Sequence, residues 1–262
     1  MPDLDTAPLD TAPADAAPLD PATAATARRP RTARERVREE MTAEILAVAR
    51  QHLARDGAPA LSLRSVARDL GMAPSALYRY FDGRDALLSA LILEAYESLA
   101  GEAEHAADEA AAAGAAHGAG DAERWLAVPR SLRAWALAHP HEWGLVFGTP
   151  VPGYEAPQAT VAPYVRVATA MARPVIEAFE TGRLRPAETT VAPAAAAAVA
   201  PVAEGLFPGL PTENVVAAVG AWSTIVGVIS LEVFGHWRNT VLEPAVLFDT
   251  VMRGVARSVG LA

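Results

Sequence analysis

The chain has 262 residues, 52% of them hydrophobic, and a formal net charge of −9, so it is long enough to bury a sizeable core in one or two domains. It contains no cysteine, which excludes disulfides, thiolate nucleophiles and cysteine-based zinc or iron–sulfur sites. Its valines and isoleucines recur at helical spacings rather than in alternating runs bounded by turns, which predicts an all-α fold.

Neither a targeting signal nor a membrane span is predicted. The N-terminus has no basic segment followed by an apolar run, as a secretory signal would require. The most apolar stretch, residues 215–229, is too short to span a bilayer and is followed closely by Glu232. We therefore expect a cytoplasmic protein that does not enter a membrane.

The charges are unevenly distributed along the chain. Residues 1–27 carry five Asp and no Arg, residues 28–84 carry twelve Arg against seven acids, and residues 85–262 carry ten Arg against nineteen acids. A basic segment joined to an acidic body is typical of a DNA-binding head on a body that DNA repels. The alternative is ordinary charge asymmetry, which is common in proteins that bind no nucleic acid.

The first predicted region, residues 1–31, is an acidic tail that ends in a short basic arm. Its composition of Asp, Thr, Ala and Pro cannot bury a core, so the tail is expected to be disordered. A helix is then predicted from about residue 32 or 33 to residue 56, where Gly57 ends it.

Two short helices follow, and with the first they make a predicted DNA-binding domain over residues 32–82. One covers residues 63–70, with the side-chain oxygen of Ser62 as its N-terminal cap. The other covers residues 74–80, with Pro74 in its first turn, where the missing N–H costs nothing.

Residues 83–262 are predicted to form a helical ligand-binding and dimerisation domain. A long helix capped by Asp82 is predicted from about Arg84 to Ala100 or beyond. Residues 101–120 are expected to form a fraying helix end and a mobile loop, because their glycines weaken the helix. The total is nine or ten helices, the remaining ones lying over residues 121–139, 141–147, 157–181, 194–204, 213–237 and 244–259.

The segment LSLRSVARDLGMAPSALYRYF, residues 61–81, has the anatomy of a helix-turn-helix. Gly71 leads the turn, and apolar residues on both helices are placed to pack them together. The second helix exposes Ser75 and Arg79 for base edges in a major groove, and nearby hydroxyl and cationic groups suit phosphate oxygens. The alternative is a helical hairpin with no ligand.

Residues 34–92 resemble the N-terminal domain of the TetR family of bacterial regulators. The resemblance rests on the long first helix, on GAPALSLRSVA (57–67), and on GMAPSALYRYF (71–81) followed by RDALL (84–88). It implies a three-helix head, a long fourth helix that links head to body, a homodimer, and double-stranded operator DNA as partner. By this likeness the DNA-contact candidates are Ser62, Arg64, Ser75, Tyr78, Arg79, Tyr80 and Arg84.

The body resembles a TetR C-terminal class with a WHG-type signature, in RAWALAHPHEWGLVFGTPVPGYEAP (133–157) and LEVFGHW (231–237). The likeness implies an effector-binding and dimerising domain. Aromatic and polar side chains of these helices are candidates for an apolar effector pocket; the alternatives are plain core and, for Arg133 with Glu232, a structural ion pair. The ligand-binding candidates are Arg133, Trp135, His139, His141, Trp143, Phe147, Tyr154, Trp222, Glu232 and Phe234.

The last two predicted helices carry broad apolar faces. Packed against their copies they would form a four-helix dimer interface, as the family resemblance also implies. The alternative is that these faces are intramolecular core.

No metal, cofactor or catalytic site is expected. The best metal-like cluster, His139, His141 and Glu142, is interrupted by Pro140, and a His-x-His pair on a helix does not put both rings on one face. Neither a nucleophile elbow nor a glycine-rich phosphate loop is present. The favoured hypothesis is a repressor that a small-molecule effector releases from a palindromic operator; the alternatives are an architectural DNA binder, and a ligand-binding module or enzyme whose head is vestigial.

Overall fold

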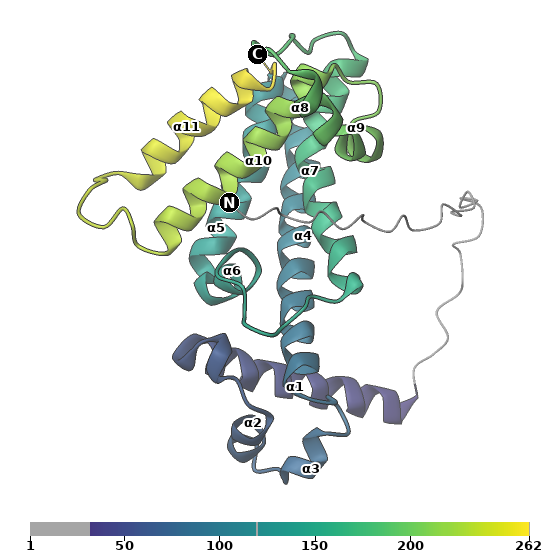
Figure 1. Ribbon diagram of the computed structural model, residues 1–262, viewed down its shortest axis with the longest axis vertical. Helices are drawn as coiled ribbons and strands as arrows, with labels where there is room; N and C mark the ends of the chain where they lie inside the picture. Colours follow the sequence, from purple (N-terminus) through teal and green to yellow (C-terminus); the bar gives the residue numbers. More distant parts are fainter. Residues whose placement is uncertain (1–31, 119, 262) are drawn as a thin grey trace, which may run out of the picture. The chain divides into compact units, whose positions relative to one another are not determined.

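The computed structural model describes residues 32–118 and 120–261. In these residues it contains eleven α-helices, two short 3-10 helices and no strand (Figure 1). The predicted all-α fold is confirmed. The predicted N-terminal tail and basic arm lie outside the described residues.

The first four helices are α1 (Ala33–Asp56), α2 (Leu63–Asp69), α3 (Pro74–Leu77) and α4 (Arg84–His117). They are followed by α5 (Asp121–Ala138), α6 (Pro140–Phe147), α7 (Val161–Glu180), α8 (Pro193–Ala198), α9 (Ala200–Leu206), α10 (Thr212–Val233) and α11 (Pro244–Ser258). The 3-10 helices cover Ala58–Ala60 and Gln158–Thr160.

The chain divides into two units, residues 1–40 and 41–262. In the described part of the first unit, α1 begins with a capping box. The backbone N–H of Thr32 donates to Glu35 Oε2 at 2.7 Å, and Thr32 Oγ1 accepts from the Glu35 N–H at 3.2 Å. Two donors that the helix itself leaves unpaired are satisfied in this way.

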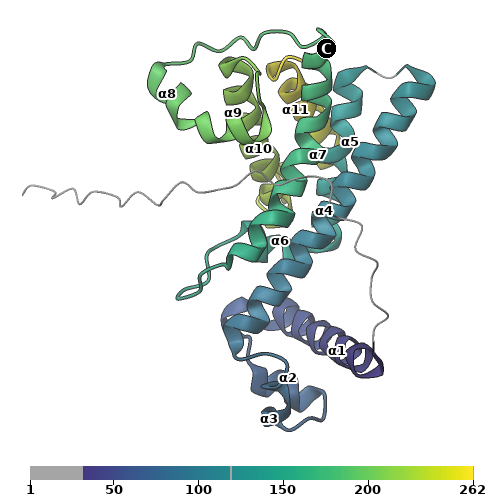
Figure 2. The same ribbon diagram turned by 90° about the vertical axis from the view of Figure 1, so that its right-hand side faces the viewer.

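The second unit holds two hydrophobic clusters. The smaller joins α1 from residue 41 onward with α2, α3 and the start of α4; Ile45, Val66, Leu77 and Leu87 are fully buried in it. The larger joins the rest of α4 with α5, α6, α7, α10 and α11. Helix α4 therefore contributes to both clusters, and Figure 2 shows it running from the three-helix head into the helical body.

Helix α4 is longer than the sequence pattern predicts. It continues to His117, and its Ala103 and Ala107 are buried in the larger cluster. The expectation of a frayed loop over residues 101–120 is therefore wrong for most of that stretch. Packing against α5 and α7 outweighs the weak helix propensity of the glycines.

Other helix boundaries also differ from the prediction. The single helix expected over residues 194–204 is two helices, α8 and α9, separated at Val199. Helix α10 ends at Val233 rather than at residue 237, and Gly235 takes the left-handed φ of +77° that favours glycine after a helix.

The predicted side-chain caps do not form. Ser62 is the N-cap residue of α2, but its side chain makes no capping hydrogen bond, and Gly83 rather than Asp82 occupies the N-cap of α4. The predicted end of α1 is confirmed, since Gly57 follows Asp56 with a φ of +77° and donates to the carbonyl of Leu53 at 3.0 Å.

Helix α10 is long and apolar enough to cross a membrane by length and composition, and it is the one helix of the described residues that meets this test. Only 28% of its most apolar window is buried. Core and interface helices of water-soluble proteins pass the same test, so the finding is weak evidence for a membrane span.

Candidate nucleic-acid interface and ligand cavity

Helices α2 and α3 are packed together by a small set of apolar contacts. Val66, Ala67 and Leu77 are fully buried, and the absence of a bulky side chain at Ala67 lets the helices approach. Gly71 has a left-handed φ of +66°, and the Met72 N–H after it donates to the Ala67 carbonyl at 2.8 Å. The turn therefore requires the glycine that the sequence supplies.

Five of the seven DNA-contact candidates lie on α2, on α3 or in the turn after it. Arg64, Ser75, Tyr78 and Arg79 are exposed, whereas Tyr80 is half-buried and packs against the smaller hydrophobic cluster. The exposed side chains surround a rigid centre at Leu77. This arrangement presents one face of the head to a partner.

The other two candidates, Ser62 and Arg84, are half-buried. The Arg84 guanidinium donates to the Ala58 carbonyl at 3.0 Å and to the Leu61 carbonyl at 3.2 Å. These bonds tie the first residue of α4 to the loop before α2. Arg84 thus has a structural role inside the head that its residue type alone does not indicate.

A buried histidine joins α1 to α2. His52 is 2% exposed, and its Nε2 lies 2.7 Å from Asp69 Oδ2. The hydrogen bond from His52 lowers the pKa of the Asp69 carboxyl because it stabilises the charged form. Sequence reasoning missed this pair, whose members are seventeen residues apart.

Several pocket candidates have structural partners in the body. Arg133 and Glu232 form a bidentate ion pair at 2.7 and 2.5 Å, with the side chains 20% and 11% exposed. Trp143 is fully buried and its indole N–H donates to Ser230 Oγ at 3.1 Å. The indole N–H of Trp135 donates a hydrogen bond to Ser98 Oγ at 2.9 Å.

Four further candidates lie at other places. His139 stacks on the Trp135 ring with centroids 4.9 Å apart. The Tyr154 hydroxyl lies 2.9 Å from the Ser89 hydroxyl of α4. The rest of the Tyr154 side chain packs against the smaller cluster. His141 and Phe234 are exposed. The structure therefore does not gather the predicted set around one cavity.

A different set of residues lines an apolar cavity, which has a volume of about 460 Å³. Its walls come from α7, α9 and α10, with Trp125 of α5 and with Val259 directly after α11. Trp222 is the one predicted pocket residue among them. Small side chains create the space: Ala168 and Ala172 on α7, Gly205 on α9, and Ala218 on α10. No local sequence pattern marks a cavity that five separate segments enclose.

Comparison with known proteins identifies the family. Residues 45–91 match the family described as "Bacterial regulatory proteins, tetR family", and residues 125–255 match "Tetracyclin repressor-like, C-terminal domain". The HTH-type transcriptional regulator Rv1816 of Mycobacterium tuberculosis is 35% identical over 223 residues, covering 82% of this chain and 91% of that protein. The chain belongs to the TetR family. The resemblance predicted from the sequence is confirmed, and the protein is a DNA-binding transcriptional regulator.

Solved structures agree with this assignment. The putative regulatory protein SCO4313 is 34% identical to this TetR-family regulator, covers 86% of it and 98% of its own chain, and has a TM-score of 0.67. The transcriptional regulator FadR from Bacillus subtilis, in complex with stearoyl-CoA, has a TM-score of 0.58 at 13% identity, covering 82% of this chain and 98% of that one. The second likeness shows the fold alone.

A closed ring of four aromatic side chains lies beside the cavity of this regulator. Tyr96 of α4, Phe147 of α6, Trp222 of α10 and Tyr164 of α7 contact one another edge to face, with centroid distances of 5.9–6.1 Å. Such geometry places the positive edge of one ring on the negative face of the next. Two members of this aromatic ring, Tyr164 and Trp222, also line the cavity.

The same aromatic ring reaches toward the DNA-binding head. Tyr96 packs against the smaller hydrophobic cluster, and Val146, next to Phe147, packs against both clusters. Leu145 and Val151 of the same segment also touch the smaller cluster. Helix α6 and the loop after it therefore connect the cavity wall with the core of the head.

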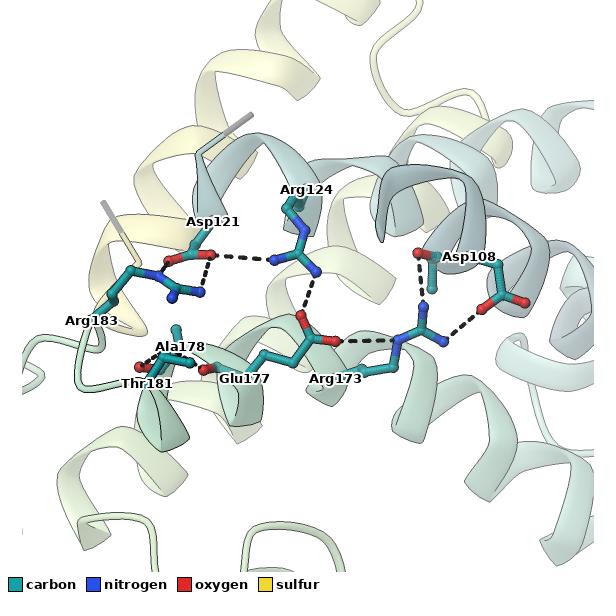
Figure 3. A network of polar contacts seen from close by, with 9 residues as sticks. Asp108, Asp121, Arg124, Arg173, Glu177, Ala178, Thr181 and Arg183 are labelled. Carbon is teal, nitrogen blue, oxygen red and sulfur yellow. Dashed lines mark hydrogen bonds and ion pairs between the residues drawn. The ribbon is translucent and has the colours of Figure 1, made fainter. Parts of the chain in front are cut away.

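Ion pairs fix the position of α7, which forms one wall of the cavity (Figure 3). Arg173 donates to Asp108 of α4 at 2.7 Å, and Arg124 of α5 pairs with Glu177 of α7. Arg183, just after α7, donates to Asp121 at 2.8 Å. In residues 32–118 and 120–261, no group of three or more His, Asp or Glu side chains is placed to hold a metal ion.

Proposed function

We propose that this regulator is a repressor that binds a palindromic operator as a homodimer and is released by a small-molecule effector. The observation that carries the DNA-binding mode is the head itself. The outer residues of α3 and the turn after it, Ser75, Tyr78 and Arg79, are exposed around the fully buried Leu77. Two copies of α3 would enter successive major grooves about one helical turn apart.

In this arrangement Ser75 and Arg79 contact base edges. Ser62, Arg64, Tyr78 and Tyr80 contact phosphates on either side of the groove, where they fix the register of the head on the duplex. Arg84 acts mainly through the carbonyls that it holds, and through them it positions the N-terminus of α2.

The proposed dimer interface is the outer face of α10 and α11. Leu231 of α10 is 43% exposed and Val246 of α11 is 62% exposed, although both helices are rich in apolar residues. Gly220 and Gly227 of α10 are exposed and leave that helix open to close approach. Pairing the two helices with their copies would bury this surface in a four-helix arrangement.

The proposed effector site is the 460 Å³ cavity, a size within the usual range for small-molecule sites. Occupancy would displace Tyr164 and Trp222, and the aromatic ring would pass the displacement through Phe147 and Tyr96 to the core of the head. The effector then favours a spacing of the two heads that does not fit the operator. The coupling can be no larger than the difference in its affinity for the two states.

A competition gel tests this function. The full chain is bound to a labelled fragment from its own promoter and challenged with unlabelled promoter or random DNA. A strong preference for the promoter is expected. Equal competition by random DNA would favour an architectural DNA binder, and no binding even in low salt would favour a ligand-binding protein with a vestigial head. We expect the protein to act in the cytoplasm, with no metal, cofactor or catalysis involved.

A further inference from the structure

We propose that the cavity between α7, α9 and α10 takes an uncharged, predominantly apolar ligand and excludes both anions and cations. The inference rests on the proposal that this cavity is the effector site. It adds the chemical class of the effector, which neither the family nor the relatives assign.

The composition of the wall is the first observation. The lining residues are aliphatic, aromatic or small, and they include no Asp, Glu, Arg or His. Thr169 contributes a hydroxyl, but that hydroxyl already donates to the Val165 carbonyl of its own helix at 2.9 Å. Tyr164, Trp125 and Trp222 add only a phenol and indole N–H groups, which suit an uncharged polar atom on the ligand.

The second observation concerns the arginines of the helices that build the wall. On α7, Arg166 donates to Glu104 at 2.7 and 2.6 Å, and Arg173 donates to Asp108 at 2.7 Å. Helices α9 and α10 contain no arginine, and the chain as a whole contains no lysine. An anion in the cavity would therefore have to compete with an existing carboxylate for any cation of α7.

The arginines of α5 are engaged in the same way. Arg124 pairs with Asp121 and Glu177, and Arg130 donates to Asp249 at 2.8 Å. Arg133 forms the bidentate pair with Glu232, which also occupies the carboxylate at the end of α10. Since a buried charge without a partner is strongly disfavoured, neither sign of charge is accommodated by the wall.

The entrance is apolar too. Val165, Val202 and Val219 line the cavity and are 47%, 36% and 37% exposed, so they form its rim on α7, α9 and α10. A ligand reaches the aromatic side chains inside by passing these valines. A desolvated, uncharged molecule crosses such a rim without losing charge–water interactions.

A matched set of probes tests the inference on the full chain in the absence of DNA. The compact set is 2-acetylnaphthalene, 2-naphthoate and 2-naphthylmethylammonium, which differ mainly in charge, and 2-decanone is an elongated neutral probe. Binding is measured by calorimetry and by the shift in Tm. We expect at least one neutral probe to bind about 100-fold or more tightly than either charged naphthyl compound, since an unpaired buried ion carries a large desolvation penalty.

Three variants locate the binding. Ala168→Trp fills the cavity from α7, and Gly205→Leu fills it from α9, where an added side chain meets open space at the backbone. Ala162→Trp is the control, because Ala162 is an exposed residue of α7 outside the cavity wall. A cooperative melt followed by circular dichroism checks that each variant folds. Neutral-probe binding is expected to disappear in the two filled variants and to persist in the control.

Other results would overturn the inference. If 2-naphthoate or 2-naphthylmethylammonium binds with an affinity within tenfold of that of 2-acetylnaphthalene, and this binding is lost in the filled variants, the cavity takes charged ligands. Neutral-probe binding that persists in both Ala168→Trp and Gly205→Leu would take place outside the cavity. If neither neutral probe binds up to its solubility limit, the cavity does not take apolar ligands. Failure of the proposed function is a separate result, because it is the absence of promoter-specific DNA binding by the same preparation.

Discussion

Arg84 illustrates how a side chain assigned by its type acquires a second role from its surroundings. Its position beside the helix-turn-helix predicts a phosphate contact, but the guanidinium spans the carbonyls of Ala58 and Leu61. Hydrogen bonds from a charged donor stabilise a fold more than neutral ones do, and these two add to the backbone bond that the Ala58 carbonyl accepts from the Leu61 N–H. The sequence likewise predicts Trp143 and Arg133 as ligand contacts, and in the structure both have protein partners.

Replacing Arg84 should destabilise the head. Arg84→Ala is expected to lower the free energy of opening α2 by about 1–3 kcal/mol, because both carbonyls lose their charged donor. Hydrogen exchange of α2 amides measures this opening directly. Tryptophan fluorescence would not report it, because all five tryptophans lie outside the head. Arg68→Ala is the matched control on an arginine whose side chain is 76% exposed. Unchanged exchange in Arg84→Ala would contradict the structural role.

The His52–Asp69 pair should make the stability of the head depend on pH. The pKa of Asp69 is lowered in the folded state by its hydrogen bond to His52, so the ionised carboxylate stabilises the fold above the unfolded pKa of about 4. This contribution is lost as the pH falls through the lower, folded pKa. Denaturation of the parent and Asp69→Asn should differ at pH 6 and converge toward pH 3, whereas the exposed Asp82→Asn control should follow the parent. A constant difference over this range would contradict the linkage.

At the scale of elements, local signals predicted the head well. Gly57, Gly71 and Pro74 mark helix ends and turns whose chemistry is local, so the sequence alone locates α1, α2 and the start of α3. The length of α4 was underestimated because Ala103 and Ala107 are held by tertiary packing. The cavity could not be predicted at all, since it depends on small residues at Ala168, Gly205 and other positions meeting in space.

Filling the cavity should imitate the effector. Ala168→Trp is expected to weaken operator binding about tenfold, within the usual range of allosteric coupling. Phe147→Leu removes one of the four aromatic side chains that join the cavity to the head. In that background Ala168→Trp should have little effect on operator affinity. Fluorescence anisotropy on the four proteins of this double-mutant cycle measures the coupling. Additive effects would mean that the aromatic ring does not transmit occupancy.

At the scale of the whole molecule, the acidic net charge belongs to the tail and body, and the head carries the basic excess. The described structure leaves apolar side chains of α10 and α11 exposed, which is the pattern expected of one subunit of a homodimer. The sequence predicts apolar faces on the last two helices, because a stripe that recurs at helical spacing is a local signal. Part of these faces packs into the larger hydrophobic cluster, and dimerisation through the exposed part stays a prediction.

Charge on the proposed dimer surface should separate the subunits. Gly227→Arg is expected to give a monomer by sedimentation and to weaken operator binding about 100-fold or more, because two linked heads gain strongly from joint binding. An added side chain at Gly227 meets nothing within 4 Å, so the fold of the subunit should be kept. Gly101→Arg is a matched control at an equally open helical glycine of α4. A Gly227→Arg dimer that binds the operator normally would place the interface elsewhere.

The most direct test of the central claim is the operator discrimination of Arg79→Ala. The ratio of promoter affinity to random-DNA affinity is measured for the parent, for Arg79→Ala, and for Arg185→Ala, which removes an exposed arginine of the loop after α7. A base-edge contact predicts a ratio about 10–100-fold lower for Arg79→Ala and an unchanged ratio for the control. If Arg79→Ala discriminates as well as the parent, α3 is not the element that reads the operator.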